Sequence, residues 1–405
     1  LTILKACLRK MNIPESVAEF QSVMVELRRD FHRNPELGYS EYRTSEKIAS
    51  FLENLGFDVR RNIAGTGLSA LWPSAVKSAP AIAFRADMDA LPLEEENTHD
   101  YVSLNKGCMH ACGHDGHMAI LLGLALWLKK ENRHFNRAIK LIFQPAEEGP
   151  GGAARMIEEG VLNNPEVERI FAMHLWNNLP YGKACIKPGA LMASVDEFEI
   201  RIGGRGGHGA MPHQTSDAIL ALGYVIVALQ SVVARRIDPR EAAVLSIGKV
   251  DAGSARNIIA DSAVLSGTVR SFSPDIRKKM PALIEEVAAA AAAVCGAGIE
   301  LSWTELYPAT INDVDAARDL AAAAESVLEK ENIVENETTM ASEDMSYFLN
   351  AVPGCYYFLG SANAESGLCM PHHHPRFDFD ERAMGAAVAV YAAYLEKFHS
   401  VQPMK

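Results

Sequence analysis

Short apolar segments alternate with segments of helical length at both ends of this 405-residue chain. Parallel strands need a crossover between them, usually a helix, and these helices cover both faces of the sheet. The alternation therefore predicts an α/β domain built on a mostly parallel sheet. In the first half of the chain, the expected strands are 57–60, 68–72, 81–84, 139–143 and 169–173, and the expected helices are 17–31, 42–55, 115–131 and 152–159.

The pattern changes after Pro188–Gly189, where apolar and polar residues alternate as in a half-buried strand. The expected order from there is strand, helix, strand, strand, helix, strand, which is ferredoxin-like. The first pattern resumes after Pro308. We therefore predict a discontinuous α/β domain formed by residues 1–188 and 306–405, with a smaller α+β domain inserted at 189–305.

Composition excludes several classes of function. The formal net charge is −12 and no run of Lys and Arg occurs, which argues against nucleic acid as a partner. The Ala-rich stretch Val287–Ile299 is shorter than the roughly 20 residues that cross a bilayer, so we expect no membrane association. Residues 1–13 lack the apolar core of a secretory signal, and seven scattered cysteines form no disulfide framework. We expect a cytoplasmic protein.

Residues that bind metals gather at the ends of predicted strands. In open α/β sheets, ligands bind beyond the carboxyl ends of the strands, so these segments can converge on one crevice. Imidazole, thiolate and carboxylate together suit Zn, Mn, Co or Ni better than Ca or Mg. The donors exceed the roughly four ligands of one metal, which favours a two-metal site with a bridging water. The segments are Asp87–Asp89, His110–His117, Glu147–Glu148, His174 and His372–His374.

Cys112 and His114 give the sharpest metal signal. Two residues apart in a loop that contains Gly113, both side chains can point at one centre, whereas on a helix they would diverge. On spacing alone, a buried cysteine beside a helix-entry histidine remains an equal alternative. We expect Asp115 to cap the helix that follows and His117 to be a structural histidine inside it.

The adjacent carboxylates of Glu147 and Glu148 repel each other unless a cation or a proton is present. Because neighbouring side chains diverge, one can bind metal while the other holds a proton; a solvated acidic turn is the alternative. His174, expected at a strand end, is equally ambiguous. Asp87 is a candidate for orienting a ligand imidazole, and Asp89 reads as a turn residue.

Other chemistries find weaker support. Gly204-x-Gly206-x-x-Gly209 formally matches a dinucleotide fingerprint, but Pro212 delays the helix that the motif requires. The sequence contains no Gly-x-Ser-x-Gly elbow and no Walker A motif. A nicotinamide oxidoreductase and a metal-dependent binding protein remain as alternatives to a hydrolase, although a binder has no need of an unligated Glu147.

Several motifs together resemble the peptidase M20 amidohydrolases, in the branch of hippurate hydrolases, N-acyl-amino-acid aminoacylases and auxin-conjugate hydrolases. The resemblance runs in order from about Glu26 to the C-terminal helix. It implies a metallohydrolase domain with an inserted ferredoxin-like domain that serves as lid and dimerisation element. The motifs are Arg85-Ala-Asp-Met-Asp-Ala-Leu-Pro92, Met109-His-Ala-Cys-Gly-His-Asp-Gly-His117, Gln144-Pro-Ala-Glu-Glu-Gly149, Gly203-Gly-Arg-Gly-Gly-His208, Gly267-Thr-Val-Arg270 and Ser342-Glu-Asp344.

The resemblance also implies roles for individual residues. It makes Glu147 the general base and places His208 in the active site of a partner subunit, which implies a homodimer. Asn257 and Arg270 resemble the groups that hold the substrate carboxylate. Arg85 stands where the wider family often has a metal-binding histidine, so it is no ligand. The implied ligands of two divalent ions are Cys112 as the bridge, His114, Glu148, His174 and His373, with His372 and His374 as alternatives to His373.

The implied activity is metal-dependent hydrolysis of the amide bond of small N-acyl amino acids, of the hippurate hydrolase or aminoacylase type. A hydroxide between the two metals would attack the carbonyl, Glu147 would move the proton, and His208 would stabilise the oxyanion. A dipeptidase or a biosynthetic N-acetyl-amino-acid deacetylase of the same family is the alternative. The sequence does not identify the metal, the acyl group or the amino acid.

Overall fold

The structure, a computed structural model, describes residues 11–132 and 135–401 and divides into two compact units. Unit 1 comprises Leu1–Gly189, Ile311–Glu337 and Tyr347–Lys405, and unit 2 comprises Ala190–Thr310 and Thr338–Ser346. Unit 2 thus includes a segment, Thr338–Ser346, that lies outside the inserted domain expected at 189–305. The reason is backbone pairing, because Ala193 N–H bonds to the carbonyl oxygens of Thr339 and Ala341 at 3.2 and 3.0 Å. Residues 1–10, on which the expected absence of a secretory signal depends, lie outside the described residues.

Unit 1 is built on an eight-stranded sheet. Its central pairs are parallel, β4 with β3, β3 with β5, and β5 with β16, while β1, β2 and β6 join antiparallel. Strands β3 and β4 are buried along their whole length, as central parallel strands must be when both faces are covered. The strand order is β1 (Asp58–Ile63), β2 (Gly67–Trp72), β4 (Ala138–Gln144), β3 (Ala81–Asp87), β5 (Val167–Pro180), β16 (Gly354–Ala362), β6 (Ala184–Cys185) and β15 (Ile333–Val334).

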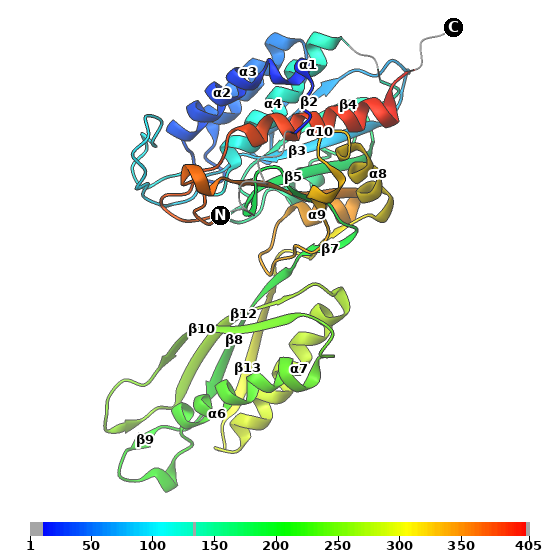
Figure 1. The fold of residues 1–405 in the computed structure, drawn as a ribbon. Coiled ribbons are helices and arrows are strands. Elements are labelled where there is room, and N and C mark those ends of the chain that lie inside the picture. The colour runs from blue at the N-terminus through cyan, green and yellow to red at the C-terminus, as the bar shows by residue number, and fades with distance from the viewer. Residues whose placement is uncertain (1–10, 133–134, 402–405) are drawn as a thin grey trace. The chain divides into compact units, whose positions relative to one another are not determined.

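Helices α2 (Gln21–Arg33), α3 (Tyr42–Leu55), α4 (His114–Glu131) and α10 (Arg382–His399) gather over one face of this sheet (Figure 1). Helix α4 is apolar around most of its circumference, because it packs against the other three helices and against β3. The remaining elements are α1 (Glu15–Ala18), α5 (Ala153–Glu158), α8 (Val314–Ala324), η4 (Lys330–Asn332) and η5 (Ala364–Ser366), with β7 (Gly189–Met192), β14 (Thr310–Asn312) and α9 (Met345–Ala351) where the chain passes between the units.

The start of α4 differs from the sequence expectation. The helix begins at His114, and Gly113 precedes it with a φ of 91°, a conformation that only glycine adopts without strain. This turn redirects the chain between Cys112 and His114. Asp115 therefore lies inside the first turn rather than at the cap, and its carboxylate is available for contacts with α2.

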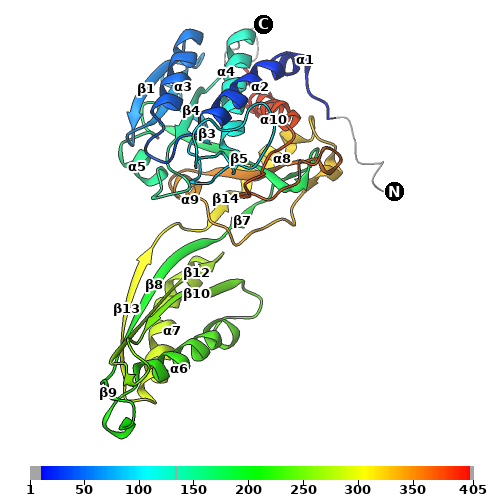
Figure 2. The same cartoon turned by 90° about the vertical axis from the view of Figure 1, so that its left-hand side faces the viewer.

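Unit 2 has the order β8 (Ser194–Gly203), α6 (Ala218–Ser231), β10 (Ala243–Ala252), β12 (Ser262–Ser271), α7 (Pro274–Ala293) and β13 (Gly298–Glu305). The four strands form an antiparallel sheet in the order β10-β12-β8-β13. Figure 2 shows α6 and α7 on one face of this sheet. Alternate residues of β8 and every fourth residue of α7 from Met280 to Ala292 meet in the core between them. A small sheet of β9 (Gly207–His208) and β11 (Ile258–Ile259), the turn η2 (Pro212–Gln214) and the π-helix η3 (Val232–Arg236) complete the unit.

The predicted fold class is confirmed: unit 1 is α/β with a mostly parallel sheet, and the insertion has the ferredoxin-like order of elements.

The sequence led us to expect no membrane association, but helix α6 is strongly apolar. The stretch Ala218–Arg236 meets the length and composition of a membrane span, with 33% of it buried. One such helix is weak evidence for a membrane, because core helices of soluble proteins meet the same criteria. Residues such as Ala221, Val225 and Leu229 are buried against the sheet. The opposite side exposes Ile219, Leu220, Tyr224 and Val227.

A buried ion pair joins the sheet of unit 2 to α7. Asp196 on β8 is buried and accepts hydrogen bonds from Nε and Nη2 of Arg277 at 2.9 and 2.6 Å and from the backbone N–H of Leu306 at 3.2 Å. A buried ion left without its partner is strongly destabilising.

We expect Asp196→Ala to lower the free energy of unfolding of unit 2 by about 3–5 kcal/mol, because the Arg277 guanidinium would lose its carboxylate partner and the Leu306 N–H its acceptor. Hydrogen exchange of the β8 and β12 amides against urea concentration measures this. Glu199→Ala is the matched control, since Glu199 makes an exposed pair with Arg201 and should cost less than about 1 kcal/mol. Equal losses in the two variants would contradict the importance of the buried pair.

Candidate metal centre

Residues from five separate segments of unit 1 converge near the carboxyl ends of the central strands. Asp87 is the last residue of β3, Glu147 and Glu148 follow β4, and Cys112 precedes α4. His174 lies in the middle of β5 rather than at its end, because the second half of β5 continues to pair with β16. The fifth segment carries His372–His374 and lies between η5 and α10.

Cys112 belongs to two groups of candidate ligands. Its Sγ lies within 4.8 Å of ligand atoms of His114 and His174 in one group, and of Glu148 and His373 in the other. Sγ is 3.4 Å from His174 Nε2, and Glu148 Oε1 is 3.0 Å from His373 Nε2 and 4.0 Å from His114 Nε2. A thiolate shared by two groups is the arrangement that a bridging ligand between two cations requires.

The state of His114 tests whether these residues fit a metal. Its Nδ1 is 2.9 Å from the carbonyl oxygen of Asp89, which places the proton there. Its Nε2 is buried and makes no hydrogen bond within residues 11–132 and 135–401. A buried ring nitrogen without a hydrogen-bond partner is costly, and a cation on the Cys112 side that displaced any proton there would satisfy it. The thiol, imidazole and carboxylate donors fit divalent ions such as zinc.

The pKa shifts of the site residues also fit a metal-binding site. Burial raises the pKa of the Cys112 thiol well above its usual range, and the carboxylates of Glu148 and Glu147 raise it further. Burial lowers the pKa of His114, but the nearby carboxylates, Asp87 foremost, outweigh this and raise it to about 10. Without a cation the site therefore retains protons, which a metal ion must displace.

Asp87 holds His117, a histidine next to the candidate ligands. Its Oδ1 is 2.6 Å from His117 Nδ1, and its Oδ2 accepts a hydrogen bond from Arg85 Nη1 at 2.6 Å. His117 Nε2 accepts the backbone N–H of Leu175 at 3.0 Å, so both ring nitrogens of His117 are occupied. Asp87 is 3.7 Å from His114 Nδ1, so its short contact is to His117 rather than to a candidate ligand.

Asp89 is a positioning residue that sequence reasoning missed. Its Oδ1 and Oδ2 accept the backbone N–H groups of Glu147 and Glu148 at 3.0 and 2.9 Å. The turn that carries these two residues contains Ala146 with a φ of 56°, an uncommon conformation for a residue other than glycine. Asp89 therefore fixes the direction in which both carboxylates leave the turn. The sequence signal that could have identified Asp89 is a second carboxylate two residues after Asp87, just past the end of β3, which is the neighbour of β4.

Among the three consecutive histidines, the geometry favours His373 as the ligand. Its backbone N–H bonds to Ala111 O at 2.9 Å, and its φ of 64° turns the ring toward Glu148. His372 instead donates from Nε2 to Leu175 O at 2.8 Å and stacks on Trp176. His374 Nδ1 accepts the backbone N–H of Arg376 at 3.0 Å.

His208 and Asn257 lie together in unit 2. His208 on β9 pairs with Ile258 on β11, and Gly209 N–H bonds to Asn257 O at 2.9 Å. His208 Nδ1 accepts the backbone N–H of Ala210 at 3.1 Å, so the neutral ring carries its proton on Nε2.

Arg270 lies on β12 of the four-stranded sheet, toward the end of that strand away from β11. It is eight residues along β12 from Ser262, the end that adjoins β11, which corresponds to about 27 Å. Its Nη1 donates to Met340 O at 2.8 Å. Within one chain, Arg270 and Asn257 therefore lie too far apart to hold the same carboxylate.

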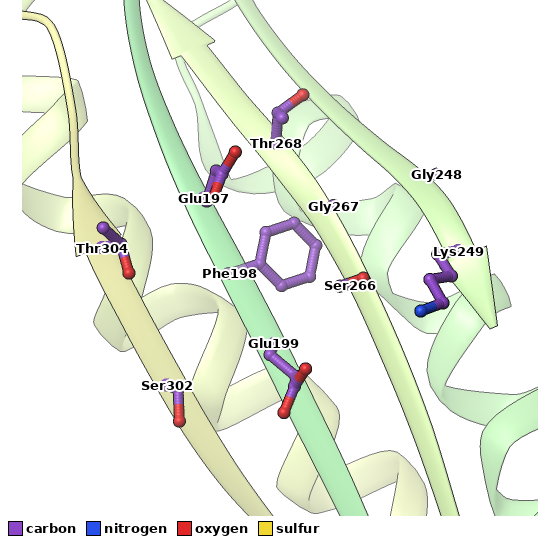
Figure 3. A pocket seen from close by; sticks show the side chains of 10 residues that line it. All are labelled: Glu197, Phe198, Glu199, Gly248, Lys249, Ser266, Gly267, Thr268, Ser302 and Thr304. Atoms are coloured by element: carbon purple, nitrogen blue, oxygen red, sulfur yellow. The ribbon is translucent and has the colours of Figure 1, made fainter. Parts of the chain in front are cut away.

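The open face of the unit 2 sheet carries a hollow of about 550 Å³ that contains none of the predicted site residues (Figure 3). Polar side chains of β8, β10, β12 and β13 line it, on the face opposite α6 and α7. They include Glu197, Glu199, Lys249, Thr268 and Ser302.

Comparison with known proteins places this geometry in a family. Residues 83–397 match Peptidase family M20/M25/M40. The chain is 39% identical over 374 residues to IAA-amino acid hydrolase ILR1-like 2 of Arabidopsis thaliana, covering 91% of this chain and 84% of that protein. It is 36% identical over 392 residues to hippurate hydrolase of Campylobacter jejuni, covering 96% of this chain and 100% of that protein.

Among solved structures, the YXEP protein of Bacillus subtilis, a dinuclear metal binding peptidase from the M20 family, superposes with a TM-score of 0.82 at 35% identity. The match covers 93% of this chain and 98% of that one. The resemblance drawn from the sequence motifs is confirmed: the chain belongs to peptidase family M20 and is an amidohydrolase.

Proposed function

We propose that this chain hydrolyses the amide bond of N-acyl amino acids whose acyl group is aroyl or acetyl. The observation that carries the proposal is the pair Glu147–Glu148 beside Cys112 and the histidines, because one carboxylate can bind metal while the other moves a proton. The printed names of the two relatives, an IAA-amino acid hydrolase and a hippurate hydrolase, support this class of substrate.

Two divalent ions would be held with Cys112 as the shared ligand, His114 and His174 on one side, and Glu148 and His373 on the other. When bound, they polarise the substrate carbonyl and make water nucleophilic at neutral pH. The imidazole and thiolate donors favour Zn, Mn, Co or Ni over Mg and Ca.

Glu147 acts as the general base. It is 7% exposed, and Asp89 fixes its backbone, so the carboxylate is held in a site from which water is largely excluded. It takes the proton of the attacking water and delivers it to the departing amine nitrogen. His208 donates from Nε2–H to the carbonyl oxygen as negative charge develops there.

The substrate carboxylate is bound by Arg270 and Asn257 from different subunits, because within one chain Asn257 lies next to β11 while Arg270 lies far along β12 from the end that adjoins β11. This requires a homodimer in which His208 also reaches the active site of the partner. The exposed apolar side of α6, formed by Ile219, Leu220, Tyr224 and Val227, supports burial of unit 2 against a second copy.

We further propose a reducing, cytoplasmic location, supported by the free thiols of the six cysteines within the described residues.

The proposed function is tested with N-benzoylglycine, N-acetylmethionine and an unblocked dipeptide. The metal-loaded enzyme should hydrolyse the two acylated amino acids, lose activity on chelation and regain it when metal returns. Glu147→Gln should lower kcat by about 10²–10⁴-fold with unchanged metal content, because the proton acceptor is lost. Activity on the dipeptide alone would refute the substrate class, and a Glu147→Gln variant within several-fold of wild type would refute the assignment of the base.

Cys112→Ala should lose at least one metal ion per chain in elemental analysis, because both ligand groups share its sulfur. Cys295→Ala, which alters a cysteine of unit 2, is the matched control and should keep the full complement. Equal metal content in the two variants would mean that Cys112 is not a ligand.

His208→Ala should lower kcat by about 10²–10³-fold without loss of metal, because one donor to the oxyanion is missing. Mixing His208→Ala and Glu147→Gln subunits should restore about a quarter of wild-type activity, since half of the dimers are mixed and each has one intact site. Mixed dimers verified by differential tagging that remain inactive would contradict the shared site.

A further inference from the structure

A second group of candidate metal ligands lies in unit 1, outside the Cys112 centre. It consists of His32 on α2 and of Glu95 and His99 in the segment between β3 and α4. Glu95 Oε1 is 3.1 Å from His32 Nε2 and 3.4 Å from His99 Nε2, and the three atoms lie within 4.8 Å of one another. Tetrahedral ligands of zinc, with bonds of about 2.0–2.1 Å, stand about 3.4 Å apart. Both distances to Glu95 Oε1 are close to that spacing.

Hydrogen bonds on the far side of His32 and Glu95 orient both side chains toward the position between the three ligand atoms. His32 Nδ1 is 2.8 Å from Asp115 Oδ2, so Nε2 faces Glu95. A carboxylate on the far nitrogen is the usual support of a metal-bound histidine. Glu95 Oε2 accepts the backbone N–H of Ser103 at 2.7 Å, which leaves Oε1 turned toward the two histidines, where it also accepts the Asn97 amide at 3.0 Å.

His99 shows the need for a further partner. Neither of its ring nitrogens makes a hydrogen bond within the described part of the chain, and both atoms are shielded from solvent. The ring stacks on Tyr101 with centroids 3.6 Å apart, which holds it in place. The side chain as a whole is 19% exposed, so the ring lies at the edge of the buried group. A metal bond would satisfy one nitrogen of a ring whose nitrogens make no hydrogen bond among the described residues.

The charge around this group also matches a dication. Four carboxylates in contact with the group or with its supports face two guanidinium groups, so two negative charges remain in a largely buried region when the His32 ring is neutral, as it is in a metal-bound imidazole. Charges buried in this way need compensation. The groups are Glu95, Asp115, Asp378 and Glu381 against Arg28 and Arg29.

We propose that His32, Glu95 and His99 bind a third divalent ion, zinc by preference, with water in the fourth position. Two imidazoles exclude Mg and Ca as natural occupants. The ion has a structural function: it ties α2 to the segment between β3 and α4, which also carries Cys112. It is independent of the proposed substrate and of the two ions at the Cys112 centre.

The test measures the zinc content of the full-length wild type and of two variants. Each protein is first treated with a chelator and then dialysed against Zn²⁺. Wild type should hold one more ion per chain than His99→Phe, in which an aromatic ring still stacks on Tyr101. His213→Phe, which alters an exposed histidine of unit 2, should match wild type. If the Cys112 centre did not bind zinc, the zinc content of all three proteins would fall equally. The difference between wild type and His99→Phe would remain. Equal zinc in wild type and His99→Phe would overturn the proposal and favour a proton bridging His32 and the carboxylates.

A second measurement does not depend on the folding of a variant. Crystals of the zinc-loaded wild-type protein, measured at the zinc absorption edge, should show an anomalous peak between His32, Glu95 and His99. Peaks at the Cys112 centre without one at this group would overturn the proposal while leaving the proposed function untouched.

Discussion

The structure depends on one electrostatic constraint: carboxylates, imidazoles and a thiol are buried together at the carboxyl ends of the central strands, where their protonation states depend on one another. Burial and the Glu148 and Glu147 carboxylates raise the pKa of the Cys112 thiol, and the carboxylates around His114 raise the pKa of its imidazole. Water cannot solvate the excess negative charge that the carboxylates would carry here, since most of these side chains are buried. Divalent cations compensate this charge, and the same cations supply the chemistry of amide hydrolysis.

The backbone around the centre is held in conformations that the chain does not favour locally. Ala146 and His373, neither of them a glycine, both have positive φ and lie within two residues of candidate ligands. Strained residues persist where surrounding contacts determine them, and they concentrate at functional sites. Here the contacts are the Asp89 carboxylate on the turn after β4 and the Ala111 carbonyl on His373.

Asp115 connects the two histidine groups of unit 1. It follows His114 in the first turn of α4, and its carboxylate contacts both Arg28 and His32 on α2. The residue that follows candidate ligand His114 in the chain is therefore also the support behind His32. A metal at His32, Glu95 and His99 would stiffen the segment that leads to Cys112, because it would add a bond between that segment and α2.

The sequence by itself determined the fold class, the family and the kinds of donor atom. The mostly apolar runs of β3 and β4 and the alternation of apolar and polar residues in β8 indicate which faces are buried, and this information is local in the sequence. It did not determine which of His372, His373 and His374 turns toward Glu148, nor that Asp89 holds the Glu147–Glu148 turn. It also did not show that Thr338–Ser346 packs with unit 2 or that His99 meets His32. These outcomes depend on positive φ values and on backbone hydrogen bonds between residues far apart in the chain. Only tertiary structure decided them, because local propensity carries no information about which distant partner will satisfy a buried polar group.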